Sequence, residues 1–170
     1  MRPRLNRVTN IVVAGLGGQG VLKASDIISS VAFARGLDVK KSEIHGMSQR
    51  GGSVSSDVRF GREVFSPMVP PGEADFLVLL DQDQLAANRA ALGDSGVLLH
   101  PGLLDPITAT NKRSLNVALT GMLSAWLDFD EREWIEAIRA NLPERHHESN
   151  IQVFRAARAA GLKIRNGGNS

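Results

Sequence analysis

The chain has 170 residues, of which 42% are apolar and 22% charged, with a formal net charge of +2. These values are typical of one globular domain and argue against a disordered chain. The sequence holds no cysteine, which excludes disulfides, thiolate zinc sites, cysteine nucleophiles and cysteine-ligated iron–sulfur clusters within this chain.

The charge and apolar patterns also indicate location and partners. No basic cluster is interleaved with aromatic residues, so we expect no nucleic acid partner. The apolar run Ile11–Ala14 is short and ends in glycine, which is typical of a strand rather than a signal peptide. No stretch approaches the roughly 20 apolar residues that span a bilayer. We therefore expect a cytoplasmic protein without membrane contact.

The first elements follow in a familiar order. Ile11–Ala14 predicts a buried parallel strand, and the glycine-rich turn Gly15–Gly20 precedes a helix over 21–35. Gly36 is placed to end that helix, and residues 37–41 predict a second strand. This strand–turn–helix–strand order is typical of a doubly wound α/β sheet.

The middle of the chain predicts a loop and then a hairpin. Residues 42–52 are rich in glycine, serine and other polar groups. Apolar residues then alternate on both sides of Gly61-Arg62, which predicts a β-hairpin turning there. Further on, the pattern predicts a strand over 76–80, a helix over 82–92 and a short strand over 96–99.

The last third predicts only helices. Ser114 is placed as the N-cap of a first helix, and Asp130 with Glu133 forms a capping-box pattern for a second. A third helix is predicted over 149–160, ended by Gly161. We thus predict an α/β fold with an open, mostly parallel, Rossmann-like doubly wound sheet, a β-hairpin insertion and a helical C-terminal part. Residues 1–165 form a single domain, and 166–170 form a disordered tail.

The first candidate site is the turn Gly15–Gly20, which matches the spacing G-x-G-x-x-G between a strand and a helix. Glycine lets backbone approach a phosphate closely, and the helix dipole favours an anion there. Glu43 could then accept the hydroxyls of a dinucleotide ribose. A tight turn whose glycines serve only packing is the alternative, and the spacing leaves both open.

The second candidate site is the polar segment 42–53. Glu43, His45 and Arg50 offer a carboxylate, an imidazole that can donate or accept a proton and a planar guanidinium fork. Each has a purely structural alternative, such as an ion pair between Glu43 and Arg50, but a structural loop rarely needs this assortment. We interpret the loop as functional.

Two other features complete the candidates. Asn116 is unfavourable inside a helix, and it is placed to reach either a loop or a ligand. His146 and His147 are adjacent and point to different sides of a helix, so we predict no metal site. The residues proposed to contact a cofactor come from both loops and the later helix: Gly15, Gly17, Gly18, Gln19, Gly20, Gln49, Gly51, Gly52, Ser53 and Asn116.

The two motifs in this order resemble the gamma domain of the pyruvate/2-ketoisovalerate ferredoxin oxidoreductase family. Within it, the likeness is strongest to the beta subunit of indolepyruvate ferredoxin oxidoreductase. The resemblance is carried by the glycine turn, the HGMSQRGGS stretch at 45–53, residues 71–75 and residues 116–121. The segment 101–115 is shorter than in most members, which predicts fewer strands.

The resemblance implies a subunit of a complex that oxidatively decarboxylates a 2-oxoacid, usually to an acyl-CoA, and reduces ferredoxin. Thiamine diphosphate and iron–sulfur clusters would belong to a larger partner subunit, and this chain alone would bind no cofactor and be inactive. Its two loops would face the active-site or coenzyme A region, with Glu43, His45 and Arg50 as candidate catalytic residues. We expect the isolated chain to form a homodimer. The alternative is a stand-alone NAD(P)- or nucleotide-binding Rossmann-like protein.

Overall fold

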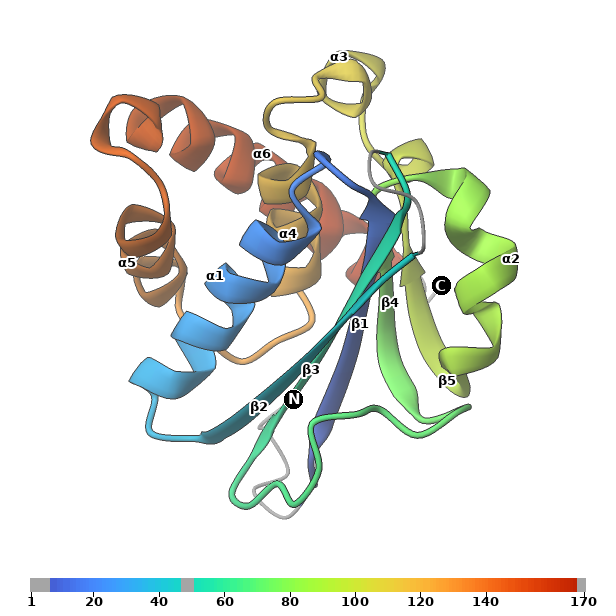
Figure 1. The fold of residues 1–170 in the computed structure, drawn as a ribbon. Helices are drawn as coiled ribbons and strands as arrows, with labels where there is room; N and C mark the ends of the chain where they lie inside the picture. Colours follow the sequence, from blue (N-terminus) through green and yellow to red (C-terminus); the bar gives the residue numbers. More distant parts are fainter. Residues whose placement is uncertain (1–6, 47–50, 168–170) are drawn as a thin grey trace.

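The computed structural model describes residues 7–46 and 51–167. It contains an open five-stranded sheet in the order β2-β3-β1-β4-β5 (Figure 1). The strands are β1 (Thr9–Leu16), β2 (Asp38–His45), β3 (Ser53–Gly61), β4 (Ala74–Leu79) and β5 (Leu92–Leu99).

One strand runs against the others. β1, β4 and β5 are parallel neighbours, whereas β3 pairs antiparallel with both β1 and β2. β2 therefore points the same way as β1, but β3 lies between them. The α/β class and the predominantly parallel sheet are confirmed, and the antiparallel insertion is the feature that separates this sheet from a dinucleotide-binding sheet with adjacent first and second strands.

The predicted hairpin exists, but at a different place. β3 continues without a turn to Gly61, and residues 64–65 form no strand, so the predicted turn at Gly61-Arg62 was wrong. The hairpin instead joins β2 to β3, with His45 opposite Val54. Residues 42–45, expected in a loop, belong to β2, because their pairing with β3 outweighs their polar composition.

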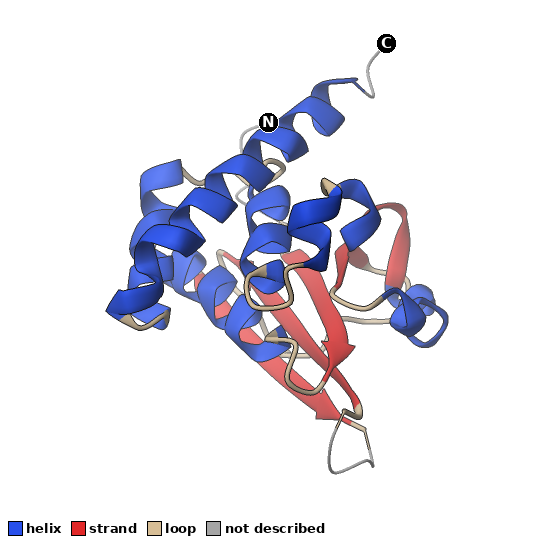
Figure 2. Cartoon of the chain, turned by 90° about the horizontal axis from the view of Figure 1, so that it is seen from above, coloured by secondary structure: helices blue, strands red, loops and turns tan. Residues whose placement is uncertain are grey.

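Helices cover the two faces of the sheet unequally (Figures 1 and 2). One face carries the long helices α1 (Val21–Ala34), α4 (Leu115–Ser124), α5 (Glu131–Asn141) and α6 (His147–Gly167). The other carries the short α2 (Leu85–Asn88), with single 3₁₀ turns before and after it instead of the predicted continuous helix. The further helix α3 (Pro106–Thr110) was not predicted. Within the described ranges, no helix combines the length and apolarity needed to cross a membrane.

The main core lies between the sheet and the four long helices. Trp134 and Phe154 are completely buried in it. A chain of ring contacts runs from Phe60 through Phe129 and Trp134 to Phe154, with successive centroids 5.8, 5.8 and 5.9 Å apart. This aromatic chain joins β3, the α4–α5 connection, α5 and α6, and it buries a large apolar area.

The C-terminal helices confirm most of their predicted ends. Ser114 occupies the N-cap position of α4, although its hydroxyl makes no capping hydrogen bond, and Asp130 with Glu133 forms the predicted capping box of α5. The end of α6 differs, since this helix passes through Gly161 and reaches Gly167. A Cβ on Gly161 would lie 2.7 Å from the carbonyl oxygen of Met122, so this glycine permits close packing of α6 on α4 and does not end the helix. Residues 166 and 167, predicted in a disordered tail, belong to α6, and residues 168–170 lie outside the described ranges.

Glu133 also joins α5 to the end of α1. Its carboxylate accepts hydrogen bonds from Arg35 Nε at 2.7 Å and from the backbone N–H of Asp130 at 2.7 Å. The hydrogen bond with Arg35, reinforced by that N–H, holds the pKa of Glu133 below its ordinary value despite partial burial.

We expect Glu133→Gln to lower the free energy of unfolding by about 1 kcal/mol at neutral pH, since the ion pair is partly exposed. Because the folded-state pKa is lowered, this contribution is present above the ordinary value of 4.5 and is lost as pH falls below it. Urea unfolding of the unaltered chain and of Glu133→Gln should show a difference in the free energy of unfolding that becomes smaller as the pH is lowered below 4.5. A constant difference across this range would contradict the ion-pair explanation.

Candidate functional site

The glycine turn lies where β1 ends and α1 begins. Gly18 and Gly20 both have φ near +85°, and Gly20 is the N-cap of α1, which no side chain caps. A Cβ on Gly20 would lie 2.4 Å from Asn116 Nδ2, and one on Gly15 would lie 2.8 Å from Gln19 Oε1. Packing thus requires Gly15 and Gly20, whereas the space around Gly18 is open.

Gln19 connects this turn to the end of β4. Its Oε1 accepts a hydrogen bond from Leu16 N at 2.7 Å, and its Nε2 donates to Asp81 Oδ2 at 2.9 Å. The other carboxylate oxygen of Asp81 accepts the N–H of Asp83 at 3.0 Å. The Gln19 side chain therefore stabilises the turn, and what the turn offers outward is mainly backbone.

Asn116 has a comparable role from the other side. It is 8% exposed at the start of α4, and its Nδ2 donates to the carbonyl oxygen of Gly20 at 3.4 Å. Its Oδ1 accepts the N–H of Val117 at 2.9 Å. Of the alternatives considered for Asn116, the structure shows contact with a loop, and this contact brings the N-terminal ends of α1 and α4 together.

The second predicted motif lies directly beside the first. The N–H of Gly17 donates to the carbonyl oxygen of Gly52 at 2.8 Å, and Gly46 N donates to Ser53 O at 2.6 Å. A Cβ on Gly17 would stand 3.5 Å from Gly51 N. Two glycine-rich segments more than 30 residues apart therefore form one surface at the carboxyl end of β1, where ligands of open α/β sheets bind. Gln49 and Arg50 lie outside the described residues.

Glu43 and His45 occupy the end of β2 and are exposed. Glu43 Oε1 lies 3.2 Å from Lys41 Nζ, which also forms an ion pair with Asp26 of α1. Burial opposes the charge of Lys41, but hydrogen bonds with Asp26 and Glu43 outweigh it and raise the pKa of Lys41 above its ordinary value. His45 makes no hydrogen bond or ion pair with another described residue.

We expect Lys41→Met to lower the free energy of unfolding by about 1–2 kcal/mol, because it leaves two carboxylates without their partner. A raised folded-state pKa means that this contribution is present below the ordinary value of 10.5 and is lost as pH rises above the folded pKa. Urea unfolding should show a lower free energy of unfolding for Lys41→Met than for the unaltered chain at neutral pH. In strong alkali this difference should disappear. Lys40→Met, which affects a more exposed pair with Asp38, is the control and should change stability less.

Two further residues at this edge were not assigned by sequence reasoning. Asp81, just after β4, accepts a hydrogen bond from Gln19 Nε2. His100 follows β5, and its Nδ1 lies 3.1 Å from Gln82 Nε2 and accepts the N–H of Gly102 at 3.2 Å. Both directly follow a strand of the parallel part of the sheet, which was the available signal.

Among residues 7–46 and 51–167, no group of three or more histidine, aspartate or glutamate side chains is close enough to hold a metal ion. His146 accepts a hydrogen bond from Arg145, and His147 Nε2 lies 2.6 Å from the carbonyl oxygen of Leu142.

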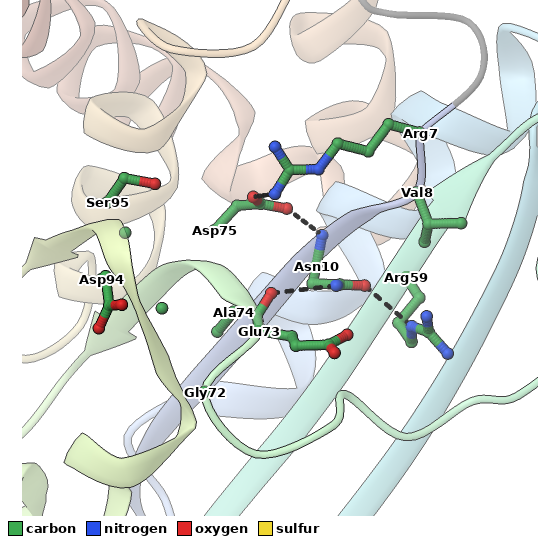
Figure 3. A pocket seen from close by; sticks show the side chains of 12 residues that line it. Arg7, Val8, Asn10, Arg59, Gly72, Glu73, Ala74, Asp75, Asp94 and Ser95 are labelled. Atoms are coloured by element: carbon green, nitrogen blue, oxygen red, sulfur yellow. Dashed lines mark hydrogen bonds and ion pairs between the residues drawn. The ribbon is translucent and has the colours of Figure 1, made fainter.

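A polar pocket of about 340 Å³ lies at the opposite, amino-terminal end of β1 (Figure 3). Asp75 binds Arg7 at 2.6 Å and the N–H of Asn10 at 2.8 Å. The Asn10 side chain donates to the carbonyl of Glu73 and accepts from Arg59 Nε at 2.9 Å. These polar groups satisfy one another, so the network ties β1 and β3 to the start of β4.

We call the turn Gly15–Gly20 and residues 51–53, which are connected by the Gly17–Gly52 hydrogen bond, the joined loops. The fold and the joined loops define an α/β domain with glycine-rich backbone at the carboxyl edge of its sheet. The model of the family "Pyruvate ferredoxin/flavodoxin oxidoreductase" matches residues 10–108, more than half of the chain. The chain is also 31% identical over 185 residues to indolepyruvate oxidoreductase subunit IorB of Methanothermobacter thermautotrophicus, a match covering 86% of this chain and 94% of the relative. The chain belongs to the pyruvate ferredoxin/flavodoxin oxidoreductase family.

Solved structures share the fold. The gamma subunit of a keto/oxoacid ferredoxin oxidoreductase from Geobacter sulfurreducens superposes with a TM-score of 0.76 at 24% identity, over 91% of this chain and 98% of that one. The 2-oxoglutarate:ferredoxin oxidoreductase from Magnetococcus marinus gives a TM-score of 0.76 at 19% identity, over 92% of this chain but 31% of that one. The same fold thus occurs as a whole small subunit and as part of a longer chain.

Proposed function

We propose that this chain is the small, gamma-type subunit of a 2-oxoacid:ferredoxin oxidoreductase, with an aromatic 2-oxoacid such as indolepyruvate as the substrate of the complex. The observation that carries the proposal is the match over 94% of a relative named as an indolepyruvate oxidoreductase subunit. The absence of cysteine from the whole chain supports the location of iron–sulfur clusters in a partner subunit.

Within such a complex, the joined loops would contribute to the active-site or coenzyme A region. The uncapped N-terminus of α1 and the backbone of Gly17–Gly20 offer N–H groups and a helix dipole suited to a phosphate. Gly51, Gly52 and Ser53 lie beside them, and the exposed His45 and Glu43 stand at the end of β2, on the far side of β3. Thiamine diphosphate would supply the decarboxylation chemistry from the partner subunit, and ferredoxin would receive the electrons.

The stand-alone NAD(P)-binding alternative is disfavoured by the sheet order as well as by the family. A ribose acceptor belongs at the end of the strand next to β1. Here β3 occupies that place, and Glu43 on β2 is one strand further away, which adds roughly 5 Å. Glu43 is also engaged by Lys41. The suggestion that Glu43 binds a ribose is therefore not supported.

The test is anaerobic affinity purification of the tagged chain from its native host, followed by 2-oxoacid-dependent reduction of a viologen dye. We expect a larger subunit with thiamine diphosphate and iron–sulfur clusters to co-purify, and we expect indolepyruvate to be among the preferred acids. A chain that purifies without a partner and without dye reduction, but binds NAD(P) saturably, would replace this proposal with the alternative.

A further inference from the structure

An apolar groove of about 510 Å³ lies beside the polar pocket, at the amino-terminal end of β1. It is bounded by the start of β1, the end of β3, the residues after α1 and the α4–α5 connection, all at the opposite end of the sheet from the glycine turn (Figure 1). We call it the aromatic groove, and the lining residues used below are Arg35, Phe60, Arg62, Trp126 and Phe129.

The apolar lining of the aromatic groove combines aromatic with aliphatic side chains: Phe60, Phe76, Trp126 and Phe129 with Val8, Leu37, Val97 and Leu127. Phe60 and Phe129 are 5% and 7% exposed, and their ring centroids are 5.8 Å apart at an angle of 56°. Trp126 is half-buried at the same groove. An apolar concavity of this volume is of the size and chemistry that hold small organic ligands. The half-buried Trp126, next to the small exposed parts of Phe60 and Phe129, favours an aromatic ligand.

The charged side chains at the rim of the groove determine which charged group a ligand needs. Arg35 is held by Glu133 and lies over the Phe129 ring, with its guanidinium carbon 5.2 Å from the centroid. Arg62 is exposed and makes no ion pair or hydrogen bond with another described residue. Arg7 and Asp75, which pair with each other, and the exposed Asp128 also line the groove. Three arginines thus stand beside two carboxylates there, and within the described part of the chain the Arg62 donors are left for the carboxylate of a ligand.

In the neighbouring polar pocket, the arginine side chains already have hydrogen-bond partners. There Arg7 is paired with Asp75, and Arg59 donates to Asn10 (Figure 3). Arg59 also donates to the carbonyl oxygen of Ser66. Glu73 and Asp94 add negative charge to its lining. Arg7 and Asp75 line both cavities, so the polar pocket has two arginines against three carboxylates, whereas the groove has three arginines against two carboxylates. The charge balance therefore favours an anion at the groove over the polar pocket.

We propose that the aromatic groove binds a small aromatic carboxylate, with the ring against Phe60, Trp126 and Phe129 and the carboxylate on Arg62. The site lies at the end of the sheet remote from the joined loops, and the inference does not depend on the proposed function. An exposed arginine that receives a carboxylate next to an aromatic surface gives selectivity for the anion over its neutral amide.

The test is calorimetric titration of the full chain with 4-phenylbutyrate and, separately, with 4-phenylbutyramide, which has the same ring and chain without the charge. We expect saturable one-to-one binding of the carboxylate and about tenfold weaker binding of the amide. Binding should also perturb the fluorescence of Trp126, since the second tryptophan, Trp134, is completely buried. Trp126→Phe should abolish that fluorescence change.

Arg62→Gln should weaken 4-phenylbutyrate about tenfold and leave the amide unchanged. The matched control is Arg139→Gln, which removes the same charge from an exposed arginine outside the groove, and it should leave both affinities unchanged. Equal binding of acid and amide, an Arg62→Gln variant with unchanged affinity, or no binding of 4-phenylbutyrate at millimolar concentration would each overturn the proposal. Loss of binding when the partner subunit is added would instead identify the groove as part of the subunit interface, and this would also overturn it.

Discussion

Gly20→Ala is expected to lower the free energy of unfolding by about 2–4 kcal/mol. This loss combines the cost of a left-handed backbone conformation for alanine with the cost of overpacking. Gly20 has φ near +85°, and its added Cβ would lie 2.4 Å from Asn116 Nδ2, 2.9 Å from Cγ and 3.2 Å from Cβ. Rotation of the terminal amide leaves Asn116 Cγ and Cβ in place, so relief requires a shift of this buried side chain and disturbs its hydrogen bond with the Gly20 carbonyl oxygen. Urea unfolding of the isolated chain measures the loss.

Gly18→Ala is the matched control for this substitution. Gly18 has the same φ near +85°, but no atom lies within 4 Å of its added Cβ. We expect this variant to lose about 1 kcal/mol, from backbone conformation alone. Adding Asn116→Ala to Gly20→Ala should restore part of the loss, as expected for residues in contact. Equal losses for the two alanine variants would contradict the close packing of α4 on the glycine turn.

The largest effect on activity is expected for His45→Ala and Arg50→Ala in the assembled complex. Loss of a group that exchanges a proton or holds an anion at a reacting centre costs about 100-fold or more. His45 is exposed and has no partner among the described residues, so its replacement should change chain stability by less than about 0.5 kcal/mol. Steady-state dye reduction, together with size-exclusion analysis of assembly, measures both outcomes.

His146→Ala provides the comparison for His45→Ala, since it removes an exposed imidazole at the turn that leads into α6. We expect this control to retain the activity of the unaltered complex. If His45→Ala and Arg50→Ala also retain full activity in an intact complex, the loop has no catalytic role and the chain is a scaffold for its partner. Loss of assembly in either variant would assign the loop to the subunit interface.

Local signals predicted much of the fold. The strand–turn–helix at the start, Gly36 after α1 and the capping box at Asp130 are all present as expected. Each depends on neighbouring residues, such as the run of apolar side chains in β1 or the spacing between Asp130 and Glu133. Such features can be recognised without knowledge of the rest of the chain.

The errors concern residues whose environment comes from distant parts of the chain. Residues 42–45 are polar, and only pairing with β3 makes them a strand. Gly161 would end a helix on local grounds, but the carbonyl oxygen of Met122 explains its presence within α6. Local propensity is a weak preference that packing and strand pairing override.

The candidate site was likewise predicted in part from local sequence patterns, and the rest became evident only from the fold. The glycine spacing predicted the first loop of the site, and the polar composition of residues 42–53 predicted the second. The family resemblance then assigned both loops to one site. That Gly17 binds Gly52, that Asn116 supports Gly20 and that Lys41 pairs with Glu43 became evident only in the folded chain.

The sequence by itself determined the absence of cysteine chemistry, the local starts and ends of several helices and the family to which the chain is similar. The tertiary structure decided which strand lies next to β1, which two carboxylates Lys41 holds and which side chains line the apolar groove with Arg62. The physical reason is that composition and short-range patterns act through neighbouring residues. Strand order, ion-pair choice and groove formation depend instead on the free energy of contacts between residues far apart in the chain.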